Sequence, residues 1–276
     1  LIAKGIIMKQ YLVFDIGGTF VKYALMDENA EILENSKIPT IREDPEGILE
    51  SMRKVAEQYT GRFEGCAVSM PGRIDTARGI AYTGGSFRFF EYTAFGQMLE
   101  ERLHVPVTLA NDGKCAAMAE AEKGALKDVE NGAVVVLGTG IGGGILLNHQ
   151  VWMGNSGGAG EFSWLLSDLK GFAVETLNLE SVLGVIWASA GSASSLATAF
   201  AAKKGEDASA HSGVTFFEAY DSGDPDAAAV LKQFGRDVAG GIFSVQSVLD
   251  LQRFAIGGGI SVRKEVTESV REALYD

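Results

Sequence analysis

The sequence contains few of the residues that bind zinc or crosslink secreted proteins. It has two cysteines and three histidines in 276 residues. Cys66 and Cys115 lie far apart and lack the paired spacing of a zinc site or a disulfide framework. Nor does any apolar run approach the length of a membrane span. We therefore expect a cytoplasmic protein without disulfides, without a zinc site and without a membrane partner.

Basic charge is also scarce. The chain has 24 lysine and arginine residues against 36 acidic ones, for a formal net charge of −12 at pH 7. No basic block occurs that could neutralise a nucleic-acid backbone, so we expect no nucleic-acid partner. A phosphate site in so acidic a protein must depend on backbone N–H groups and a metal ion. This favours a nucleotide that is bound with Mg²⁺.

The strand pattern indicates two lobes and an internal duplication. Apolar strands over residues 11–14 and 21–26 flank a glycine-rich turn, which predicts a hairpin. The same order returns over 133–147. Because the chain length suits two lobes, we place the N-terminal lobe at 8–117 and the C-terminal lobe at 118–276.

The first turn combines an acid, two glycines and a hydroxyl: Asp15, Gly17, Gly18 and Thr19. Glycines on a tight turn let backbone N–H groups face phosphate oxygens. An acid would repel phosphate directly, so the sensible role of Asp15 is to hold Mg²⁺ through water. A plain glycine-rich hairpin turn explains the same residues equally well when the motif is taken alone.

A second glycine-rich turn spans residues 138–144 and includes Gly138, Thr139, Gly140 and Gly143. It fits the Gly-x-Gly-x-x-Gly pattern of dinucleotide-binding proteins, but that pattern requires a helix after the glycines. Here an apolar strand follows instead, which predicts another hairpin. Two related loops, one from each half of the chain, suit a nucleotide held between two lobes.

Two further segments carry polar residues suited to sugar chemistry. Asn111 and Asp112 follow a strand and precede a predicted helix over 113–124, where a carboxylate can accept the proton of a sugar hydroxyl. An ordinary helix N-cap is the alternative. Glu161 ends a glycine-rich segment and is followed by aromatic residues. It could accept hydrogen bonds from two sugar hydroxyls, or it could be a solvated loop glutamate.

Together and in order, these motifs resemble the ROK family of sugar kinases and regulators, within the sugar-kinase and actin-like ATPase superfamily. The resemblance covers nearly the whole chain from Met8, and includes Pro71 with Gly72 and the segments 159–161 and 256–261. It implies an α/β, two-lobed actin-like ATPase (ribonuclease H-like) duplicated fold. It also implies an ATP-dependent, Mg²⁺-requiring kinase of carbohydrate metabolism that acts on a hexose or β-glucoside, with a homodimer as the family expectation.

The resemblance assigns a role to each matching residue. Asp112 is the expected general base, and Asp15 the expected Mg²⁺ residue. Asn111, Glu161 and Gly72 are expected to contact the sugar. The residues expected to bind ATP are Gly17, Gly18, Thr19, Gly138, Thr139 and Gly140 around the phosphates, and Gly257 and Gly258 near the adenosine.

The sequence departs from the family pattern at three places. Trp164 stands where most members have a histidine, and Trp187 aligns with a second sugar-binding glutamate. The region 179–194 lacks the usual zinc-binding cysteines, so the chain looks like the zinc-free branch. We expect two aromatic side chains to replace polar sugar contacts and to favour a bulky, less polar group such as an aglycone. Members also usually continue for another strand and helix beyond the position of Asp276.

The family includes regulators, so a sugar-binding or sensing protein without catalysis is the alternative. Regulators carry a DNA-binding helix-turn-helix module before the first strand, and the roughly ten residues that precede Tyr11 are too few for one. The seven residues before Met8 are themselves expected to lie outside the natural protein. Asp112, Asp15 and both glycine loops argue for retained catalysis. The sugar and the phosphorylated hydroxyl stay open.

Overall fold

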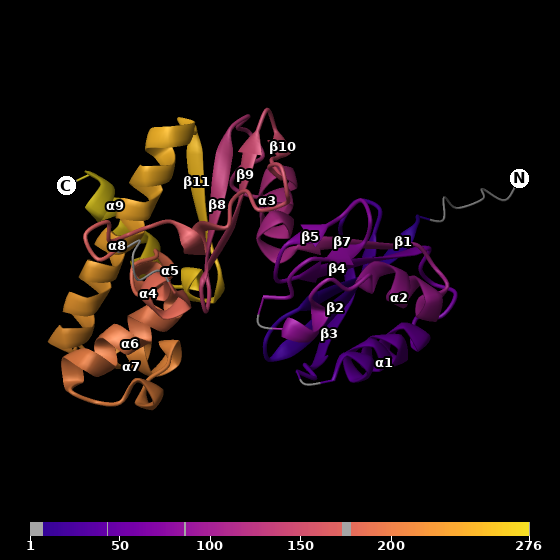
Figure 1. The fold of residues 1–276 in the computed structure, drawn as a ribbon, viewed down its shortest axis with the longest axis horizontal. Helices are drawn as coiled ribbons and strands as arrows, with labels where there is room; N and C mark the ends of the chain where they lie inside the picture. Colours follow the sequence, from indigo (N-terminus) through magenta and orange to yellow (C-terminus); the bar gives the residue numbers. More distant parts are fainter. Residues whose placement is uncertain (1–7, 43, 86, 173–177, 276) are drawn as a thin grey trace, which may run out of the picture. The chain divides into compact units, whose positions relative to one another are not determined.

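The structure is a computed structural model that describes all residues except 1–7, 43, 86, 173–177 and 276. The expectation about the residues before Met8 therefore lies outside the described residues. The chain divides into two compact units, Leu1–Cys115 with Gly154–Gly158, and Ala116–Met153 with Ala159–Asp276. Figure 1 shows the first unit in indigo to purple and the second in magenta to yellow. Each unit has its own sheet and its own apolar core.

The first unit is built on a five-stranded sheet in the order β3-β2-β1-β4-β7. The chain forms the antiparallel meander β1 (Gln10–Ile16), β2 (Phe20–Asp27) and β3 (Ile32–Pro39). Strands β4 (Gly65–Met70) and β7 (Val107–Asn111) then add parallel to β1. The predicted first hairpin is confirmed. A small two-stranded sheet of the same unit is formed by β5 (Ile74–Asp75) and β6 (Ile80–Ala81).

Two helices cover the apolar face of this sheet. Leu12, Phe14 and Ile16 alternate along β1 and are buried in one cluster with residues of α1 (Pro45–Glu57) and α2 (Phe95–Leu103). Helix α1 begins where Asp44 caps the N–H of Glu46 and proline occupies the first turn. It buries an apolar stripe at helical spacing, Ile48, Leu49, Met52, Val55 and Ala56.

The second unit repeats the first arrangement on a smaller sheet, in the order β10-β9-β8-β11. Strands β8 (Gly132–Leu137), β9 (Ile141–Leu147) and β10 (Gln150–Val151) form an antiparallel meander. Strand β11 (Arg253–Gly257) then adds parallel to β8, as β4 adds to β1. The predicted internal duplication is therefore confirmed at the level of strand order and direction.

The second glycine turn is shorter than the sequence predicts. We expected a turn over 138–144, whereas β9 already begins at Ile141. The glycines of β9 serve packing: a Cβ at Gly143 would lie 2.4 Å from the Val134 carbonyl oxygen and from the Phe162 ring. These contacts involve residues outside the glycine run, so local sequence does not reveal them. Local sequence alone therefore predicts a longer turn than the structure has.

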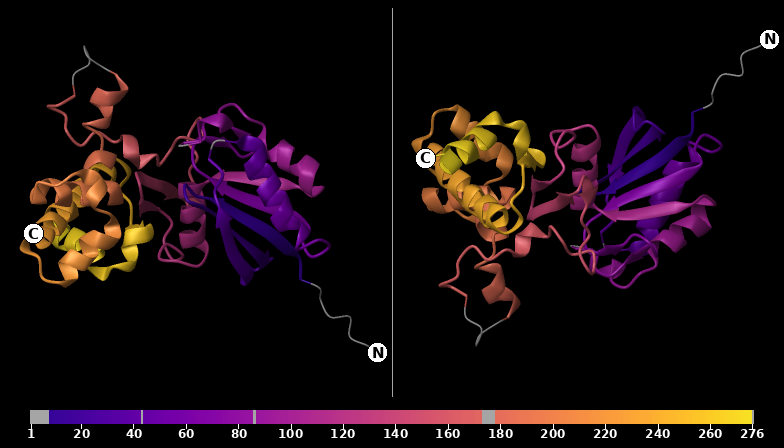
Figure 2. Two further views of the ribbon diagram at one scale, coloured as in Figure 1. Left: turned by 90° about the horizontal axis from the view of Figure 1, so that it is seen from below. Right: turned by 90° about the horizontal axis from the view of Figure 1, so that it is seen from above.

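Both faces of the second sheet are covered, which explains why β8 is apolar at successive positions. Ala133 and Val135 face the main core, and Val134 packs with Ala117 of α3 (Asp112–Glu122). Figure 2 shows the orange and yellow helices gathered on one side of this sheet. The helices of the second unit beyond α3 are α4 (Leu179–Leu183), α5 (Ala188–Gly191), α6 (Ala193–Lys204), α7 (Gly213–Asp221), α8 (Pro225–Leu249) and α9 (Lys264–Tyr275).

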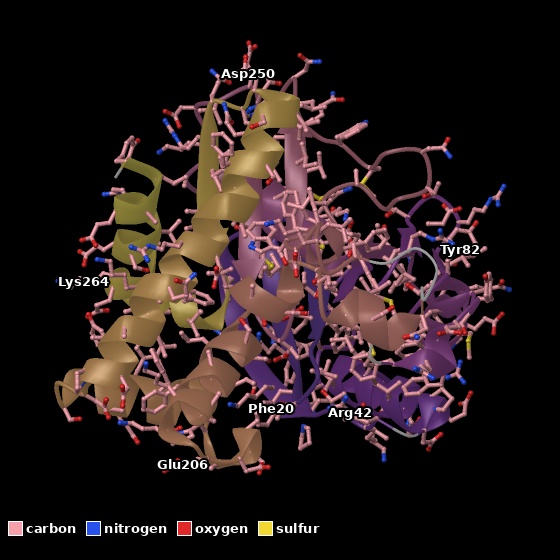
Figure 3. The ribbon with its side chains drawn as sticks, turned by 60° about the vertical axis from the view of Figure 1, so that its left-hand side comes forward. Phe20, Arg42, Tyr82, Glu206, Asp250 and Lys264 are labelled. Carbon is pink, nitrogen blue, oxygen red and sulfur yellow. The ribbon has the colours of Figure 1, made fainter. Side chains whose placement is uncertain are left out.

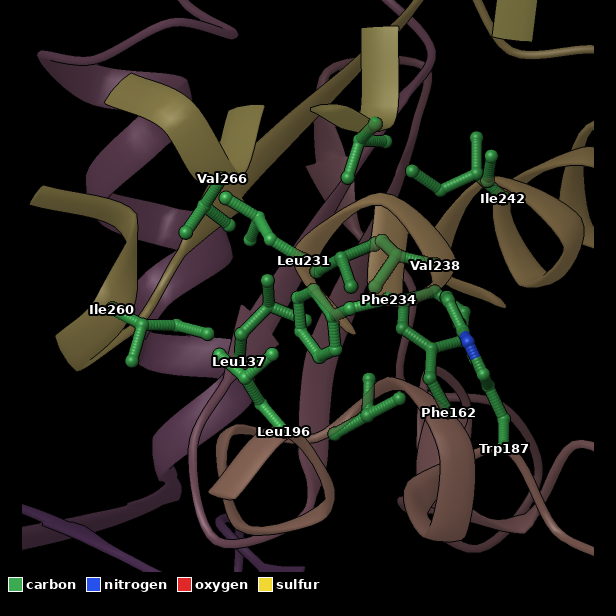
Figure 4. Packing of buried hydrophobic residues seen from close by; sticks show 14 of the residues in the cluster. Leu137, Phe162, Trp187, Leu196, Leu231, Phe234, Val238, Ile242, Ile260 and Val266 are labelled. Atoms are coloured by element: carbon green, nitrogen blue, oxygen red, sulfur yellow. The ribbon is translucent and has the colours of Figure 1, made fainter. Parts of the chain in front are cut away.

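Helix α8 is the centre of the second core. Asp224 caps its N-terminus, and Phe234 and Val238 project from it into the cluster shown in Figure 4. Trp187 packs against this helix at Gly241, where an added Cβ would lie 2.0 Å from the indole. In the described part of the chain, none of the helices combines the length and apolar character that a membrane crossing requires.

Candidate active site

The polar residues of the first unit gather at the carboxyl edge of its parallel strands. Strand register places Asp15 of β1 beside Ser69 of β4, and Met70 of β4 beside Asn111 of β7. Ligands of open α/β sheets bind at this edge. Asn111 follows Thr19 by 92 residues, which would span roughly 300 Å in an extended chain. The structure nevertheless places the first glycine loop and the Asn111–Asp112 pair at the same sheet edge.

The carboxylate of Asp15 is held at both oxygens. Ser69 Oγ donates to Oδ1 at 3.0 Å, and Lys22 Nζ lies 3.1 Å from Oδ2. The Asp15 side chain is 43% exposed, so it keeps access to solvent. Sequence reasoning missed Ser69 because it is a small polar residue inside an apolar strand. Its parallel pairing with Asp15 is the signal that identifies it.

Asn111 makes structural bonds at the end of β7. It is 3% exposed, its Nδ2 donates to the Gly72 carbonyl oxygen at 2.9 Å, and its Oδ1 accepts the N–H of Lys114 at 3.1 Å. The second bond is that of a helix N-cap. Gly72 has φ +103°, and a Cβ there would lie 2.1 Å from the Thr83 carbonyl oxygen, so only glycine fits. Asn111 thus fixes the Gly72 turn against the start of α3.

Asp112 is the first residue of α3 and is exposed. One carboxylate oxygen accepts the N–H of Gly113 at 2.8 Å. The N-terminal end of a helix stabilises negative charge, which favours the ionised form of a carboxylate placed there. The Asp112 carboxylate is therefore accessible to solvent at the start of α3.

Cys115 lies beside both acids of this edge. Burial raises the pKa of its thiol to about 11; a hydrogen bond with Ser69 opposes the shift, while the nearby charges of Asp112 and Asp15 reinforce it. Asp15 pairs in register with Ser69, and Cys115 follows Asp112 by three residues on α3, so these four residues lie at the same sheet edge of the first unit.

The second loop is tied to the start of α6. The Gly138 N–H donates to the Gly140 carbonyl oxygen at 3.0 Å, and the Gly138 carbonyl oxygen accepts the N–H of Ala193 at 2.9 Å. Gly258, with φ +97°, approaches so closely that a Cβ would lie 2.2 Å from the Leu137 carbonyl oxygen. Gly257 pairs with β8 just before this point.

A cavity of about 440 Å³ opens beside this loop within the second unit. It is lined by Gly138 and Thr139, by the first turns of α6, and by 211–213 and Gly259. Sequence reasoning missed the contributions of α6 and 211–213, which lie 55 to 75 residues beyond Gly138. Their only local signal is the capping serine that begins each helix, Ser192 for α6 and Ser212 for α7.

Glu161 lies in the same unit as the second loop, immediately before the turn 162–164. Ser163 connects this turn to β9: its Oγ accepts the N–H of Ile141 at 2.9 Å and donates to the Ile141 carbonyl oxygen at 3.0 Å. Ser163 was also missed, because its partner is 22 residues away in sequence. It fixes the position of Glu161 relative to the loop 138–140.

The two tryptophans have different environments. Trp164 is 55% exposed and available to a ligand. Trp187 is 1% exposed, it belongs to the main core, and its Nε1 donates to the Asp237 carbonyl oxygen at 3.0 Å. The expectation that Trp187 replaces a polar sugar contact is therefore wrong, because glycines at 191 and 241 let the indole pack into the core.

The predicted residues form two groups, one in each unit. The first contains the loop 17–19, Asp15, Gly72, Asn111 and Asp112. The second contains the loop 138–140, Glu161, Gly257 and Gly258. Two sheets of the same strand order, each with a glycine loop between its first two strands, define a two-unit α/β protein with a duplicated fold.

Comparisons with known proteins identify the family. The model of the ROK family matches residues 11–276, and the chain belongs to that family. It is 31% identical over 264 residues to a β-glucoside kinase of Klebsiella pneumoniae, covering 95% of this chain and 85% of that protein. It is 30% identical to a β-glucoside kinase of Listeria innocua over 253 residues, covering 91% and 82%.

Solved structures agree with this assignment. The Lmo2764 protein of Listeria monocytogenes superposes with a TM-score of 0.85 at 26% identity, over 96% of this chain and 89% of that one. A ROK family glucokinase of Streptomyces griseus, in complex with glucose and AMPPNP, superposes with a TM-score of 0.81 at 24% identity, over 97% and 90%. The chain has the actin-like ATPase fold that ROK sugar kinases share, as the sequence predicts.

Proposed function

We propose that the chain transfers the γ-phosphoryl group of ATP to a hydroxyl of a hexose or β-glucoside, with Asp112 as the general base. The observation that carries this proposal is the position of Asp112. It is exposed at the start of α3, on the sheet edge that also carries Asp15 and the first glycine loop.

The chain is an ATP-dependent sugar kinase. Relatives that are about as long as this chain, and about 30% identical to it, are named as sugar kinases. A hexose or β-glucoside is the proposed acceptor because β-glucoside kinases and a glucokinase are among those relatives. ATP chemistry and two free cysteines suit the cytoplasm, which we propose as its location.

Asp112 would act on the acceptor hydroxyl. As the sugar oxygen forms its bond to the γ-phosphorus, the carboxylate accepts the hydroxyl proton, and the bond from phosphorus to the β–γ bridging oxygen breaks to release ADP. A carboxylate at a helix N-terminus interacts favourably with the helix dipole, which suits a group that is proposed to begin this step without the proton. Its role is positioning and proton acceptance, since the transfer itself needs little covalent help.

Asp15 has the properties expected of a Mg²⁺ residue. Its carboxylate is partly exposed, and Mg²⁺ keeps several waters and needs few protein carboxylates. Among the described residues, no cluster of three or more histidine, cysteine, aspartate or glutamate side chains could hold a metal by itself. A single acid that shares the ion with nucleotide phosphates therefore fits, and the ion would neutralise phosphate charge.

Each glycine loop is a proposed phosphate-binding element. Backbone N–H groups of Gly18, Thr19, Thr139 and Gly140 are the proposed phosphate donors. The cavity beside the second loop has the size of a small-molecule site and is the proposed place for the adenosine, with Gly258 close by. A largely uncharged lining there suits a base and ribose rather than further phosphates.

The sugar would be held by polar groups and by one aromatic face. Glu161 is the proposed acceptor of two sugar hydroxyl bonds, and Asn111 and Gly72 are also proposed to contact the sugar. The exposed indole of Trp164 offers an apolar surface to an aglycone or a second ring. This supports a preference for β-glucosides over free glucose.

A coupled ADP-release assay with MgATP tests the proposal. The panel contains glucose, fructose, mannose, N-acetylmannosamine, cellobiose and gentiobiose. We expect sugar-dependent release, fastest with a disaccharide. Absence of release with every sugar, combined with sugar-dependent protection against thermal unfolding, would instead establish a sugar-binding protein without catalysis.

A further inference from the structure

The segment that follows β3 binds the carbonyl oxygens of the first glycine loop. Thr40 Oγ1 donates to the Gly17 carbonyl oxygen at 2.7 Å, and the Thr40 N–H donates to the Thr19 carbonyl oxygen at 3.0 Å. Arg42 Nη1 lies 3.4 Å from the Gly18 carbonyl oxygen. Each loop residue between β1 and β2 thus has its carbonyl group turned toward the segment 40–42.

These bonds determine where the N–H groups of the loop point. In a trans peptide the N–H lies opposite the carbonyl group of the preceding residue. The Gly17 carbonyl bond to Thr40 therefore turns the Gly18 N–H away from the segment 40–42. The Gly18 carbonyl bond to Arg42 does the same for the Thr19 N–H. The Gly17 N–H is already used within the hairpin, because it donates to the Phe20 carbonyl oxygen at 3.1 Å.

We propose that Thr40 is a positioning residue for the nucleotide phosphates. Its hydroxyl holds the Gly17 carbonyl group so that the Gly18 N–H is already oriented toward a phosphate oxygen before the nucleotide arrives. Donors that are oriented in advance lose less free energy on binding than donors that must be ordered. This inference rests on the proposed function of the loop, and it adds a residue that contacts neither nucleotide nor sugar.

Arg42 supports the same loop more weakly. Its side chain is exposed, its bond to Gly18 is long, and its guanidinium carbon lies 5.8 Å from the centre of the Phe87 ring. Figure 3 labels Arg42 together with Phe20, the first residue of β2; both lie at the lower border of the first unit. The Thr40 hydroxyl has the shorter bond and is half-buried, so its removal should have the larger effect.

Substitution of Thr40 by valine isolates the hydroxyl. Thr40→Val keeps the shape of the side chain and the backbone bond to Thr19 but removes the donor to Gly17. Thr40→Ser retains the donor. Thr60→Val is the matched control, because Thr60 Oγ1 also donates to a backbone carbonyl, that of Glu57 at 2.8 Å, in the same unit. Calorimetric titrations with ATP, ADP and adenosine, together with KM and kcat, give the readout.

We expect Thr40→Val to weaken ATP and ADP binding roughly tenfold. Loss of the hydroxyl leaves the Gly17 carbonyl group without this donor, so the loop is held less firmly. Adenosine binding and the KM of the sugar should not change. Thr40→Ser and Thr60→Val should behave as the wild type. Arg42→Gln, an exposed substitution that leaves folding intact, should weaken ATP binding by roughly threefold or less.

Two results would overturn the inference. One is a folded Thr40→Val protein that binds ATP as the wild type does. The other is an equal loss of adenosine and ATP binding, which would indicate a general disturbance. In both cases wild-type turnover would leave the proposed function intact. A wild-type protein that neither binds nor consumes nucleotide would instead contradict the proposed function itself, and the inference with it.

Discussion

Ser69 donates a hydrogen bond to Asp15 across two neighbouring parallel strands, with 3.0 Å between Oγ and Oδ1. Lys22 contacts the other carboxylate oxygen from β2. The direction of the Asp15 carboxylate is therefore set by the sheet itself and does not depend on a bound ion. An acid held in this way offers a fixed point for a hydrated Mg²⁺.

Removal of this acid should change the metal requirement. We expect Asp15→Asn to raise the Mg²⁺ concentration needed for half-maximal activity roughly tenfold or more, because the ion loses its proposed protein carboxylate. Chelation of Mg²⁺ should abolish turnover of the wild type. The measurement is a Mg²⁺ titration at fixed ATP, with Asp250→Asn as control, since Asp250 lies at a left-handed helix end that asparagine tolerates. An unchanged Mg²⁺ dependence would remove Asp15 from the metal site.

The proposed base makes a separate prediction. Asp112→Asn keeps the shape and the helix start but cannot accept a proton, so turnover should fall at least on the order of a thousandfold. Sugar binding, measured by calorimetry, should stay within a few-fold of the wild type. Asp250→Asn again serves as control. Turnover near that of the wild type would show that another group accepts the proton.

The two tryptophans should differ in what their removal costs. Trp187→Ala should lower the free energy of unfolding by about 3–5 kcal/mol, because it empties a core position. Trp164→Ala should change that free energy by about 0.5 kcal/mol or less. It should raise the KM of an aryl β-glucoside roughly fivefold relative to glucose, since it removes the exposed ring. Denaturant unfolding and sugar kinetics measure the two effects. A stable Trp187→Ala protein would contradict the packing described here.

The cysteines should be unreactive in the folded protein. Burial raises the pKa of Cys115 to about 11 and that of Cys66 to about 12. At pH 8 about one Cys115 thiol in a thousand is then ionised, and its alkylation rate should rise roughly tenfold per pH unit up to pH 11. Both thiols should react quickly in urea. Cys115→Ser should keep activity. Fast alkylation at pH 7 with loss of turnover would show a reactive thiol beside Asp112.

Local sequence was sufficient for the elements that carry their own signals. The hairpin at Gly17 and Gly18 follows from alternating strands around a glycine turn. The start of α3 follows from Asn111 and Asp112 after an apolar strand. In each case the physical cause lies within a few residues, so the pattern predicts the structure.

Contacts between distant segments could not be predicted in this way. Gly143 is in a strand because the Phe162 ring packs against it, and Trp187 is buried because Gly241 makes room for it. The partners of Ser69 and Ser163 lie 54 and 22 residues away. A single sequence gives no information about such pairs until the strand register is known. The positions of the proposed catalytic residues were therefore predictable, and the residues that orient them were not.

Analysis of the reaction products tests the central claim most directly. The protein is incubated with MgATP and the sugar that gives the fastest ADP release, and ADP, inorganic phosphate and sugar phosphate are quantified by ³¹P nuclear magnetic resonance. Phosphoryl transfer to sugar predicts equal amounts of ADP and a sugar monophosphate, with little inorganic phosphate. ADP accompanied only by inorganic phosphate, or no ADP with any sugar, would contradict it.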